Sequence, residues 1–478
     1  METISRIKAF GLFSGIIIFF LILLLPTPKN MSVTAWHTTS VALLMAVFWI
    51  TESLPLYVTA LIPIVLFPIL DISTIKQTTA PFGHPLIFLF LGGFLLAEGI
   101  QKWGLHKRIA LKIIKFIGVS PKRIIAGFML SSAFLSMWIS NTATALMMLP
   151  IGLSVISVIK SSKGLGEKEQ KKFSIALLLS IAYSCSIGGI TTLIGTPPNA
   201  LMSAFMLETY KVDISFAKWM LIGFPFTLIS LPITYILLTR IIFKLDIKLK
   251  LDKSIIENEI KAIGKISKEE RIVEIVFVIT ALLWIIRPII SKYINGISDS
   301  GIAIFGALLL FIIPGGKETT ILEWKDSKNI SWGILILFGG GLSLAQGIKN
   351  SGLAEWIANA VLNSGGIPII LMIGILTLSI IFLTELTSNT ATTAAFLPII
   401  ASIGVGMGIN PLQFVIPATI AASCAFMLPV ATPPNAIIFS SNEVSIKDMT
   451  RAGILLNIVF VFVIVLLSNT LGSIVFGY

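Results

Sequence analysis

Charged residues are scarce in this 478-residue chain: they occupy 12% of the positions, whereas hydrophobic residues occupy 55% and the mean hydropathy is +0.97. Soluble domains contain about 25% charged residues, so this composition excludes an ordinary water-soluble fold. Long apolar stretches recur, for example at 217–242 and 453–476, and such stretches are long enough to cross the ~30 Å hydrocarbon core of a bilayer. The sequence therefore predicts an all-α integral protein of the cell membrane that spans it many times.

Cysteine and histidine are also rare, with two cysteines and three histidines in the whole chain. Cys185 and Cys424 lie in apolar segments without a Cys-X-X-Cys spacing, and the histidines form no metal-ligand pattern. Neither a disulfide framework nor a metal centre is indicated. The sequence also lacks a phosphate-binding Walker motif. Since an enzyme needs titratable groups that converge on one site, we expect no catalytic residues, no enzymatic activity and no cofactor.

Basic residues exceed acidic ones, which gives a formal net charge of +12. Nucleic-acid-binding proteins gather such charge in one patch, but here the lysines and arginines are spread over the loops between apolar stretches. That distribution follows the positive-inside rule, by which basic loops stay in the cytoplasm. We therefore expect the lipid bilayer, and no nucleic acid, as a partner, with the N-terminus cytoplasmic and the C-terminus extracytoplasmic.

The apolar stretches predict about 11 transmembrane helices, at residues 8–26, 37–54, 56–70, 85–101, 173–193, 217–242, 272–290, 300–314, 331–348, 412–431 and 453–476. Two further apolar segments, 122–158 and 366–406, are too long for one span, and each carries a polar Ser-Asn-Thr sequence near its middle. Non-helical backbone at membrane depth is tolerated only where protein buries it or where it lines a water-filled cavity. We interpret both segments as re-entrant helical hairpins that enter and leave the membrane by the same face.

Two short motifs occur twice, in the same order. The sequence 140–144, Ser-Asn-Thr-Ala-Thr, returns 248 positions later at 388–392, and the sequence 196–199, Thr-Pro-Pro-Asn, returns at 432–435. The basic loops place the first hairpin on the cytoplasmic face and the second on the opposite face, so the two copies are expected to be inverted. Inverted repeats with interrupted helices are typical of secondary transporters, whose site lies near the bilayer midplane between the repeats.

The repeats divide the chain into four predicted parts. These are an N-terminal span at 1–36, a first inverted repeat at 37–243 with its hairpin at 122–158 and a helix break at 195–199, a basic cytoplasmic linker at 244–271, and a second inverted repeat at 272–478 with its hairpin at 366–406, a helix break at 431–435 and the C-terminal span. The breaks are expected at mid-membrane.

Hairpin tips and helix breaks supply groups that bind ions. Each Ser-Asn-Thr tip is followed by a helix whose first N–H groups are unpaired and whose dipole is positive at that end, which attracts an anion. Tandem prolines interrupt a helix and free carbonyl oxygens, which suit a small cation such as Na⁺. Taken singly, a Ser-Asn-Thr sequence is usually a helix N-cap and a Pro-Pro pair is a kink. The duplication of both motifs favours a binding site.

Glu385 is an acidic residue inside an apolar segment, three positions before Ser388. An ionisable residue within a membrane is a functional candidate. The corresponding residue of the first repeat is Met137, so the two repeats have no shared role for a carboxylate here. The sequence leaves two alternatives open: Glu385 carries a proton or a cation, or it braces the hairpin.

The paired tips, the paired breaks and the sequence 49–55, Trp-Ile-Thr-Glu-Ser-Leu-Pro, resemble the divalent anion/sodium symporter family, the sodium-coupled di- and tricarboxylate transporters. The resemblance implies Na⁺ as coupling ion and a homodimer in which a hairpin-bearing domain moves as an elevator against a scaffold. For the substrate it implies contacts from Asn141, Thr142, Asn389 and Thr390, with Thr196, Pro197, Thr432 and Pro433 lining the same cavity. For the ions it implies sodium site 1 at Ser136, Ser140, Asn141 and Gly195, and sodium site 2 at Thr384, Thr387, Ser388, Asn389 and Ala431.

The expected function is sodium-coupled symport of a small divalent anion, with a dicarboxylate such as succinate or malate as the favoured substrate. Hydroxyl groups, amides and helix dipoles accept other dianions, so sulfate or phosphate transport and proton coupling remain alternatives. An anion channel would also place such groups at mid-membrane. Interrupted helices in inverted repeats favour alternating access over a continuous pore.

Overall fold

The computed structural model describes residues 2–118, 120–161, 165–246, 254–316, 319–362 and 368–478. This part of the chain is helical apart from turns and extended links, and its one β-feature is an isolated bridge between Pro314 and Thr320. Among the described residues, ten helices are long and apolar enough to cross a membrane, and four more apolar helices are shorter. The predicted all-α membrane fold is confirmed.

The N-terminal part contains two long helices followed by short ones: α1 (Glu2–Leu24), α2 (Val33–Thr51), α3 (Leu56–Thr59), α4 (Ile62–Ile69), α5 (Ile75–Thr79) and the 3-10 helix η1 (Ala80–Gly83). Helices α1 and α2 pack along their length. The single span predicted at 56–70 is instead the pair α3 and α4, interrupted at Ala60 and Leu61. Pro63 in the first turn of α4 has no N–H to donate, which costs a continuous helix one hydrogen bond and favours a new start at this point.

The first repeat continues through seven α-helices: α6 (Pro85–Lys102), α7 (Leu105–Ile117), α8 (Pro121–Ser136), α9 (Asn141–Ser161), α10 (Glu167–Gly189), α11 (Pro197–Tyr210) and α12 (Phe216–Ile236), which ends in the π-helical turn η2 (Leu237–Ile242). Helices α8 and α9 form the first hairpin, within a few residues of the predicted bounds. Helix α10 packs against both arms of this hairpin and is buried from Phe173 to Gly189.

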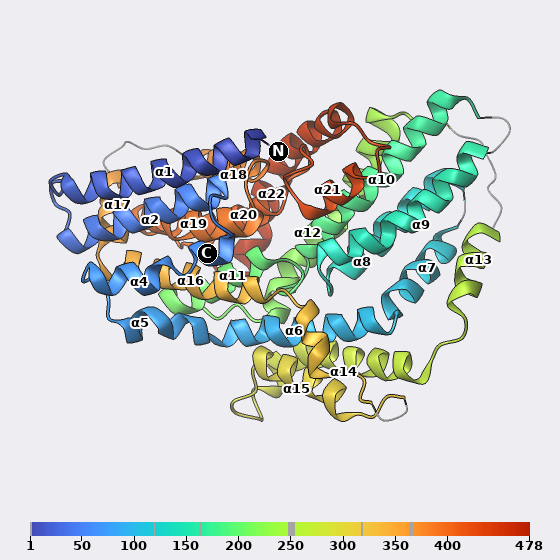
Figure 1. Ribbon diagram of the computed structural model, residues 1–478, viewed down its shortest axis with the longest axis horizontal. Coiled ribbons are helices and arrows are strands. Elements are labelled where there is room, and N and C mark those ends of the chain that lie inside the picture. Colours follow the sequence, from blue (N-terminus) through green and yellow to red (C-terminus); the bar gives the residue numbers. More distant parts are fainter. Residues whose placement is uncertain (1, 119, 162–164, 247–253, 317–318, 363–367) are drawn as a thin grey trace.

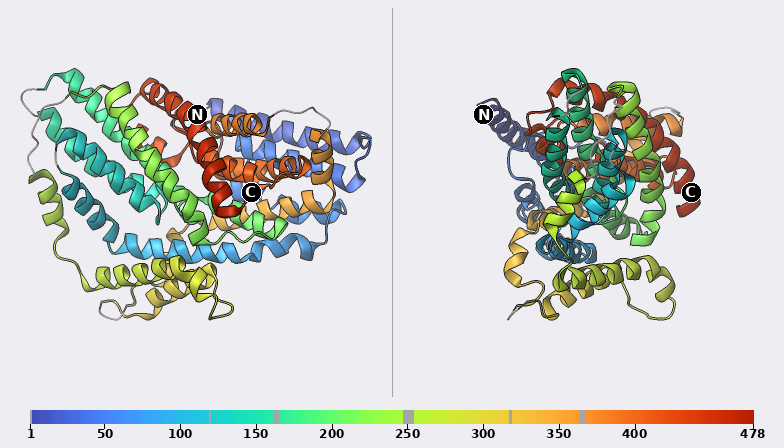
Figure 2. Two further views of the ribbon diagram at one scale, coloured as in Figure 1. Left: turned by 180° about the vertical axis from the view of Figure 1, so that it is seen from behind. Right: turned by 90° about the vertical axis from the view of Figure 1, so that its right-hand side faces the viewer.

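A middle part follows, with α13 (Ser254–Ile263), α14 (Lys268–Ile290), α15 (Asp299–Ile312) and the 3-10 helix η3 (Trp324–Asn329). Helix α15 packs on α6. In Figure 1 and in both views of Figure 2, α14 and α15, in yellow, form a layer beside α6 at the edge of the molecule.

The rest of the predicted second repeat, 272–478, follows the order of α6 to α12, with α16 (Trp332–Asn350), α17 (Leu353–Leu362), α18 (Ile369–Thr384), α19 (Asn389–Gly406), α20 (Leu412–Ala422), α21 (Pro433–Phe439) and α22 (Ile446–Phe476). Helices α18 and α19 form the second hairpin. The glycines that precede α7 and α17, Gly104 and Gly352, stand 248 positions apart and both have a positive φ, at +73° and +82°. The two repeats therefore share even this local backbone geometry.

Helices α6 and α16, which occupy matching places in the two repeats, run antiparallel. The end of α6 meets the start of α16, where Glu98 accepts a hydrogen bond from Asn329 at 2.8 Å. At their centres, Phe90 and Phe338, which are also 248 positions apart, pack edge to face with ring centroids 4.9 Å apart. Residues that correspond in the two predicted repeats are thus in contact.

Both interrupted helices unwind earlier in the sequence than predicted. The non-helical links are 190–196 and 423–432, and the prolines at 197 and 433 begin the following helices α11 and α21. Proline at the first position of a helix loses no hydrogen bond and already has a helical φ. The proline pairs therefore start helices, and the free carbonyl groups lie before them.

Candidate functional site

The two hairpin tips are short turns between helices that the polar motif interrupts. Helix α8 ends at Ser136 and α9 begins at Asn141, and in the second repeat α18 ends at Thr384 and α19 begins at Asn389. The hydroxyl of Ser140 accepts a hydrogen bond from the backbone N–H of Ala143 at 3.2 Å, so this serine does act as an N-cap. Ser140 therefore caps α9 and also lies at the tip of the hairpin.

A cavity of about 690 Å³ lies between the two repeats, where both tips and both helix breaks meet. From the first repeat it is lined by Ser140, Asn141, Thr142, Gly195, Thr196 and Pro197, and from the second by Ser388, Asn389, Thr390, Ala431, Thr432 and Pro433. The structure thus brings together twelve of the predicted site residues from four separate stretches of sequence. The remaining three, Ser136, Thr384 and Thr387, are buried and do not line the cavity.

The cavity is polar but contains little charge. Among the described residues that line it, Glu52 is the one charged side chain, and none is a lysine, arginine or histidine. Three helices longer than ten residues, α9, α11 and α19, begin at its wall, as does the short α21. The N-terminal end of a helix carries about half a positive charge, and its first N–H groups are unpaired. Helices α9 and α19 offer such N–H groups, whereas α11 and α21 begin with two prolines that have none. The wall therefore favours an anion without a basic side chain.

Two buried oxygen atoms without an N–H or O–H donor lie where the sequence predicts sodium site 1. The side-chain oxygens of Asn141 (Oδ1) and Ser136 (Oγ) are buried and accept no hydrogen bond from an N–H or O–H group of the described residues. A Cβ on Gly189 would lie 2.6 Å from Asn141 Oδ1, and one on Gly195 would overlap the Gly189 carbonyl. The tip and the break therefore approach closely because glycines stand at these points. Neutral oxygen donors of this kind fit Na⁺.

Where the sequence predicts sodium site 2, the side-chain oxygens form hydrogen bonds with one another. The hydroxyl oxygen of Thr384 lies 2.7 Å from Asn389 Oδ1 and 3.0 Å from the Ala422 carbonyl oxygen, and its one hydrogen points to one of these acceptors at a time. The hydroxyls of Thr387 and Thr392 share a hydrogen bond of 2.5 Å. A cation at this site requires the Thr384 hydroxyl hydrogen to turn away, because a ligand oxygen must direct a lone pair at the ion. The two regions correspond in position but differ in sequence, since Thr384 and Ala431 stand where the first region has Ser136 and Gly195, and they differ in their hydrogen bonds.

Asn199 and Asn435, which follow the proline pairs, form hydrogen bonds with the unwound links. Their role was not predicted from the sequence. The side-chain Nδ2 of Asn199 lies 2.7 to 3.2 Å from the carbonyl oxygens of Gly189, Ile190 and Thr192. Asn435 Nδ2 donates in the same way to the carbonyls of the second link. Both asparagines are fully buried. The sequence feature that could have indicated this role is the presence of an asparagine in both copies of the Thr-Pro-Pro-Asn motif.

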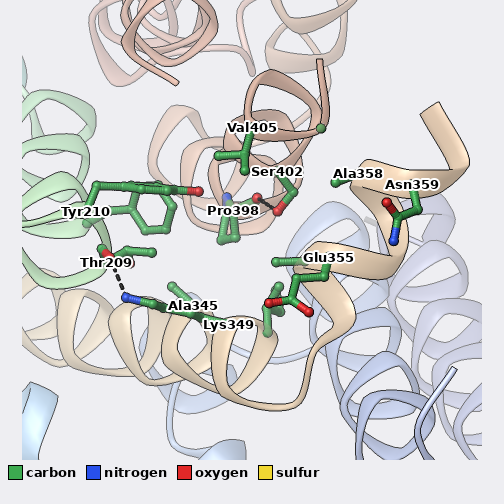
Figure 3. Close-up of a pocket in the computed structure, with 14 residues that line it drawn as sticks. Thr209, Tyr210, Ala345, Lys349, Glu355, Ala358, Asn359, Pro398, Ser402 and Val405 are labelled. Carbon is green, nitrogen blue, oxygen red and sulfur yellow. Dashed lines mark hydrogen bonds between the residues drawn. The ribbon is translucent and has the colours of Figure 1, made fainter. Parts of the chain in front are cut away.

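At its other end, helix α11 is tied to α16 and α6. Glu208 accepts a hydrogen bond from Gln346 Nε2 at 2.8 Å, and its carboxylate lies 3.8 Å from Nε2 of His84. The ammonium group of Lys349 donates to the Thr209 carbonyl, as Figure 3 shows. Helix α11 therefore connects the site cavity, at its N-terminus, to a set of polar contacts at its C-terminus.

A second cavity, of about 470 Å³, lies beside those contacts. Figure 3 shows Glu355 and Asn359 of α17 on one side of it and Tyr210 of α11 on the other. None of the predicted site residues lines this cavity. Its polar residues therefore offer matched control positions for experiments on the first cavity.

Comparison with known proteins identifies the family. Residues 7–478 match the sodium:sulfate symporter transmembrane region. The chain belongs to this family of sodium symporters. The predicted resemblance to the divalent anion/sodium symporters is confirmed, and so is the prediction of a transporter and not an enzyme. Together with the apolar helices, family membership makes the chain a multi-pass membrane protein.

Close relatives match over nearly the whole chain. The sodium-dependent dicarboxylate transporter SdcS of Staphylococcus saprophyticus is 41% identical over 476 residues, which are 98% of this chain and 92% of that protein. The SdcS of Staphylococcus aureus strain USA300 is 42% identical with the same coverage.

Solved structures at low identity share the fold. The YdaH transporter of Alcanivorax borkumensis superposes with a TM-score of 0.53 at 12% identity, over 100% of this chain and 98% of that chain. MtrF of Neisseria gonorrhoeae gives 0.57 at 16% identity, over 98% and 93%.

Proposed function

We propose that this chain is a sodium-coupled symporter of a dicarboxylate such as succinate or malate. The observation that carries the proposal is the single cavity in which both hairpin tips and both helix breaks meet, with helix N-termini and no basic side chain in its wall. An anion held there needs positive charge from elsewhere, and bound cations supply it. The substrate class is supported by the SdcS relatives, which are named as sodium-dependent dicarboxylate transporters.

We propose the following roles for the predicted site residues. The side chains of Asn141, Thr142, Asn389 and Thr390 bind the two carboxylates, and Thr196, Pro197, Thr432 and Pro433 shape the wall between them. Sodium site 1 takes ligands from Ser136, Ser140, Asn141 and Gly195, and sodium site 2 takes them from Thr384, Thr387, Ser388, Asn389 and Ala431. These oxygens supply neutral ligands that suit Na⁺, and the chemistry needs no other cofactor.

We further propose that the two repeats are inverted and exchange roles during transport. The antiparallel course of α6 and α16 and the contact between Phe90 and Phe338 support this arrangement. The site cavity has Gln101 and Ser331 in its wall, which lie at the predicted cytoplasmic ends of these helices, while the opposite end of α11 is tied down by Glu208. The conformation is then open to the cytoplasm, with the N-terminus inside and the C-terminus outside. An elevator movement within a homodimer, as in the family, completes the proposal.

Uptake into liposomes tests the function directly. Purified protein is reconstituted and supplied with labelled succinate, malate, sulfate or phosphate under an inward gradient of Na⁺, H⁺ or K⁺. We expect succinate or malate to accumulate with the Na⁺ gradient and uptake to fall to the level of empty liposomes with K⁺. If only sulfate or phosphate accumulates, the proposed substrate class is wrong. If uptake occurs only with the H⁺ gradient, the proposed coupling ion is wrong. Flux without accumulation would indicate a channel.

Cysteine accessibility tests the inverted repeats. Ser161 ends the first hairpin, Asn410 follows the second, and both are exposed. Because the native Cys185 and Cys424 are buried, they give little background, and a C185A/C424A chain removes it. We expect an impermeant maleimide to label N410C in intact cells and S161C only after the cytoplasmic face is opened. Labelling of both positions from the same side contradicts the inverted arrangement.

A further inference from the structure

Glu385 lies in the turn at the tip of the second hairpin, yet its side chain points away from the site cavity into the protein. It is 2% exposed and does not line that cavity. Its carboxylate accepts hydrogen bonds from three successive backbone N–H groups, those of Phe426, Met427 and Leu428, at 2.7 to 3.0 Å. A fourth donor, Asn457 Nδ2 of α22, lies at 2.8 Å. Both carboxylate oxygens are therefore occupied by donors.

The three N–H groups belong to the unwound link 423–432, which carries Ala431 of sodium site 2. Successive N–H groups of an unwound segment form a concave binding place for an anion, and the carboxylate occupies it. From the other side, Asn435 Nδ2 binds the carbonyls of Ala425 and Leu428. The link is thus held through its N–H groups by Glu385 and through its carbonyls by Asn435.

The first repeat lacks this arrangement. Met137 stands in place of Glu385, and its backbone carbonyl accepts a hydrogen bond from the hydroxyl of Thr192 in the shorter link 190–196. A carboxylate is needed only in the second repeat, where the link is longer and has more N–H groups to satisfy. The asymmetry explains why one hairpin tip carries an acid and the other does not.

The same contacts argue against a proton-carrying or cation-carrying Glu385. Each carboxylate oxygen of Glu385 accepts hydrogen bonds from N–H groups. Protonation would turn one of these oxygens into an O–H donor that faces an N–H donor, which is unfavourable. None of the ion pairs among the described residues involves Glu385, and Glu385 does not line the cavity. The carboxylate is matched to its donors as an anion.

We propose that Glu385 is a positioning residue for sodium site 2: its carboxylate fixes the link 423–432 against the hairpin tip, so that Ala431, Thr384 and Asn389 meet, and it carries neither the proton nor the coupling ion. The inference rests on the proposed sodium coupling. In a Glu385→Gln variant the side-chain amide presents N–H groups to Met427 or Leu428, which leaves donors unpaired and moves the link.

The test measures two quantities for the wild type and for E385Q in liposomes. These are the Na⁺ concentration at half-maximal dicarboxylate uptake and the charge moved per substrate, taken from the reversal potential. We expect E385Q to raise the half-saturating Na⁺ concentration about tenfold or more, since hydrogen bonds to a charged group are lost, with the charge per substrate unchanged. E385D keeps the charge on a shorter side chain and is expected to recover part of the Na⁺ affinity. E355Q, an exposed acid beside the second cavity, is the matched control.

Two outcomes overturn the inference. A change of one unit charge per substrate in E385Q means that Glu385 carries an ion, and an unaltered Na⁺ dependence in folded E385Q means that it positions nothing. If E385Q does not fold, N457L takes its place, because it keeps the carboxylate and removes one donor. We expect N457L to raise the half-saturating Na⁺ concentration less than E385Q does.

The increase of Tm with Na⁺, measured on purified protein without substrate, supplies a separate readout. Loss of that rise in E385Q supports the inference even where the wild type transports no dicarboxylate, which would contradict the proposed function alone.

Discussion

Removal of Na⁺ is expected to weaken binding of a dicarboxylate to the purified protein by a factor of about 25 or more. Each of two cation sites beside the anion contributes a coupling of about fivefold at the least, and the cavity wall offers no basic side chain to replace the cations. Helix N-termini supply at most about half a charge each. Two of the four that reach the wall, those of α11 and α21, begin with two prolines that have no N–H group, so the helix ends supply less charge than a dianion carries. Replacement of Na⁺ by choline therefore removes most of the positive charge at the site.

Equilibrium binding of labelled succinate at several Na⁺ concentrations measures this effect. Because binding linkage is reciprocal, saturating succinate should raise the Na⁺ affinity by the same factor as Na⁺ raises the succinate affinity. Li⁺ and changes of pH serve as controls for ion selectivity. A succinate affinity that is the same in Na⁺, Li⁺ and choline at every pH would show that another group neutralises the anion.

Asn389→Ala is expected to lower the affinities for Na⁺ and for the dicarboxylate together, each by about tenfold or more, because one amide serves both ligands. Asn389 lines the cavity, and its Oδ1 is already fixed by the hydroxyl of Thr384 at 2.7 Å. Alanine removes the amide oxygen and also leaves the Thr384 hydroxyl without this acceptor. A side chain that touched only the substrate would alter one affinity and not the other.

Na⁺-dependent uptake and substrate binding are measured side by side for N389A. The matched control is N359A, which makes the same substitution at an exposed asparagine beside the second cavity. N141A tests the equivalent position of the first repeat, where Oδ1 has no hydrogen-bond donor. N389A with wild-type Na⁺ dependence and wild-type uptake would refute the shared role.

Secondary structure could be predicted from the sequence where the length of an apolar run, or a polar interruption within it, indicated where a helix ends. The hairpins at 122–158 and 366–406 were placed to within a few residues of α8 to α9 and α18 to α19, because a polar tip interrupts a run too long for one span. The repeats were visible in the same way, since Ser-Asn-Thr and Thr-Pro-Pro-Asn are rare in apolar helices. Hydropathy failed at the unwound link 423–432, whose residues 424–430 are almost all apolar and look like the end of a span.

By itself, the sequence determined the membrane environment, the helical class, the duplication and the family, because composition, run length and motif spacing are local properties. Only the tertiary structure decided that four motifs, up to 292 positions apart from Ser140 to Thr432, line one cavity. It also decided that the link 423–432 leaves the helix, since the donors to Glu385 come from a segment about 40 residues away in sequence and can be satisfied only after folding. Asn141 and Asn389 occupy equivalent positions in the two tips, yet Oδ1 of Asn389 lies within hydrogen-bond distance of the Thr384 hydroxyl, whereas Oδ1 of Asn141 has no donor among the described residues.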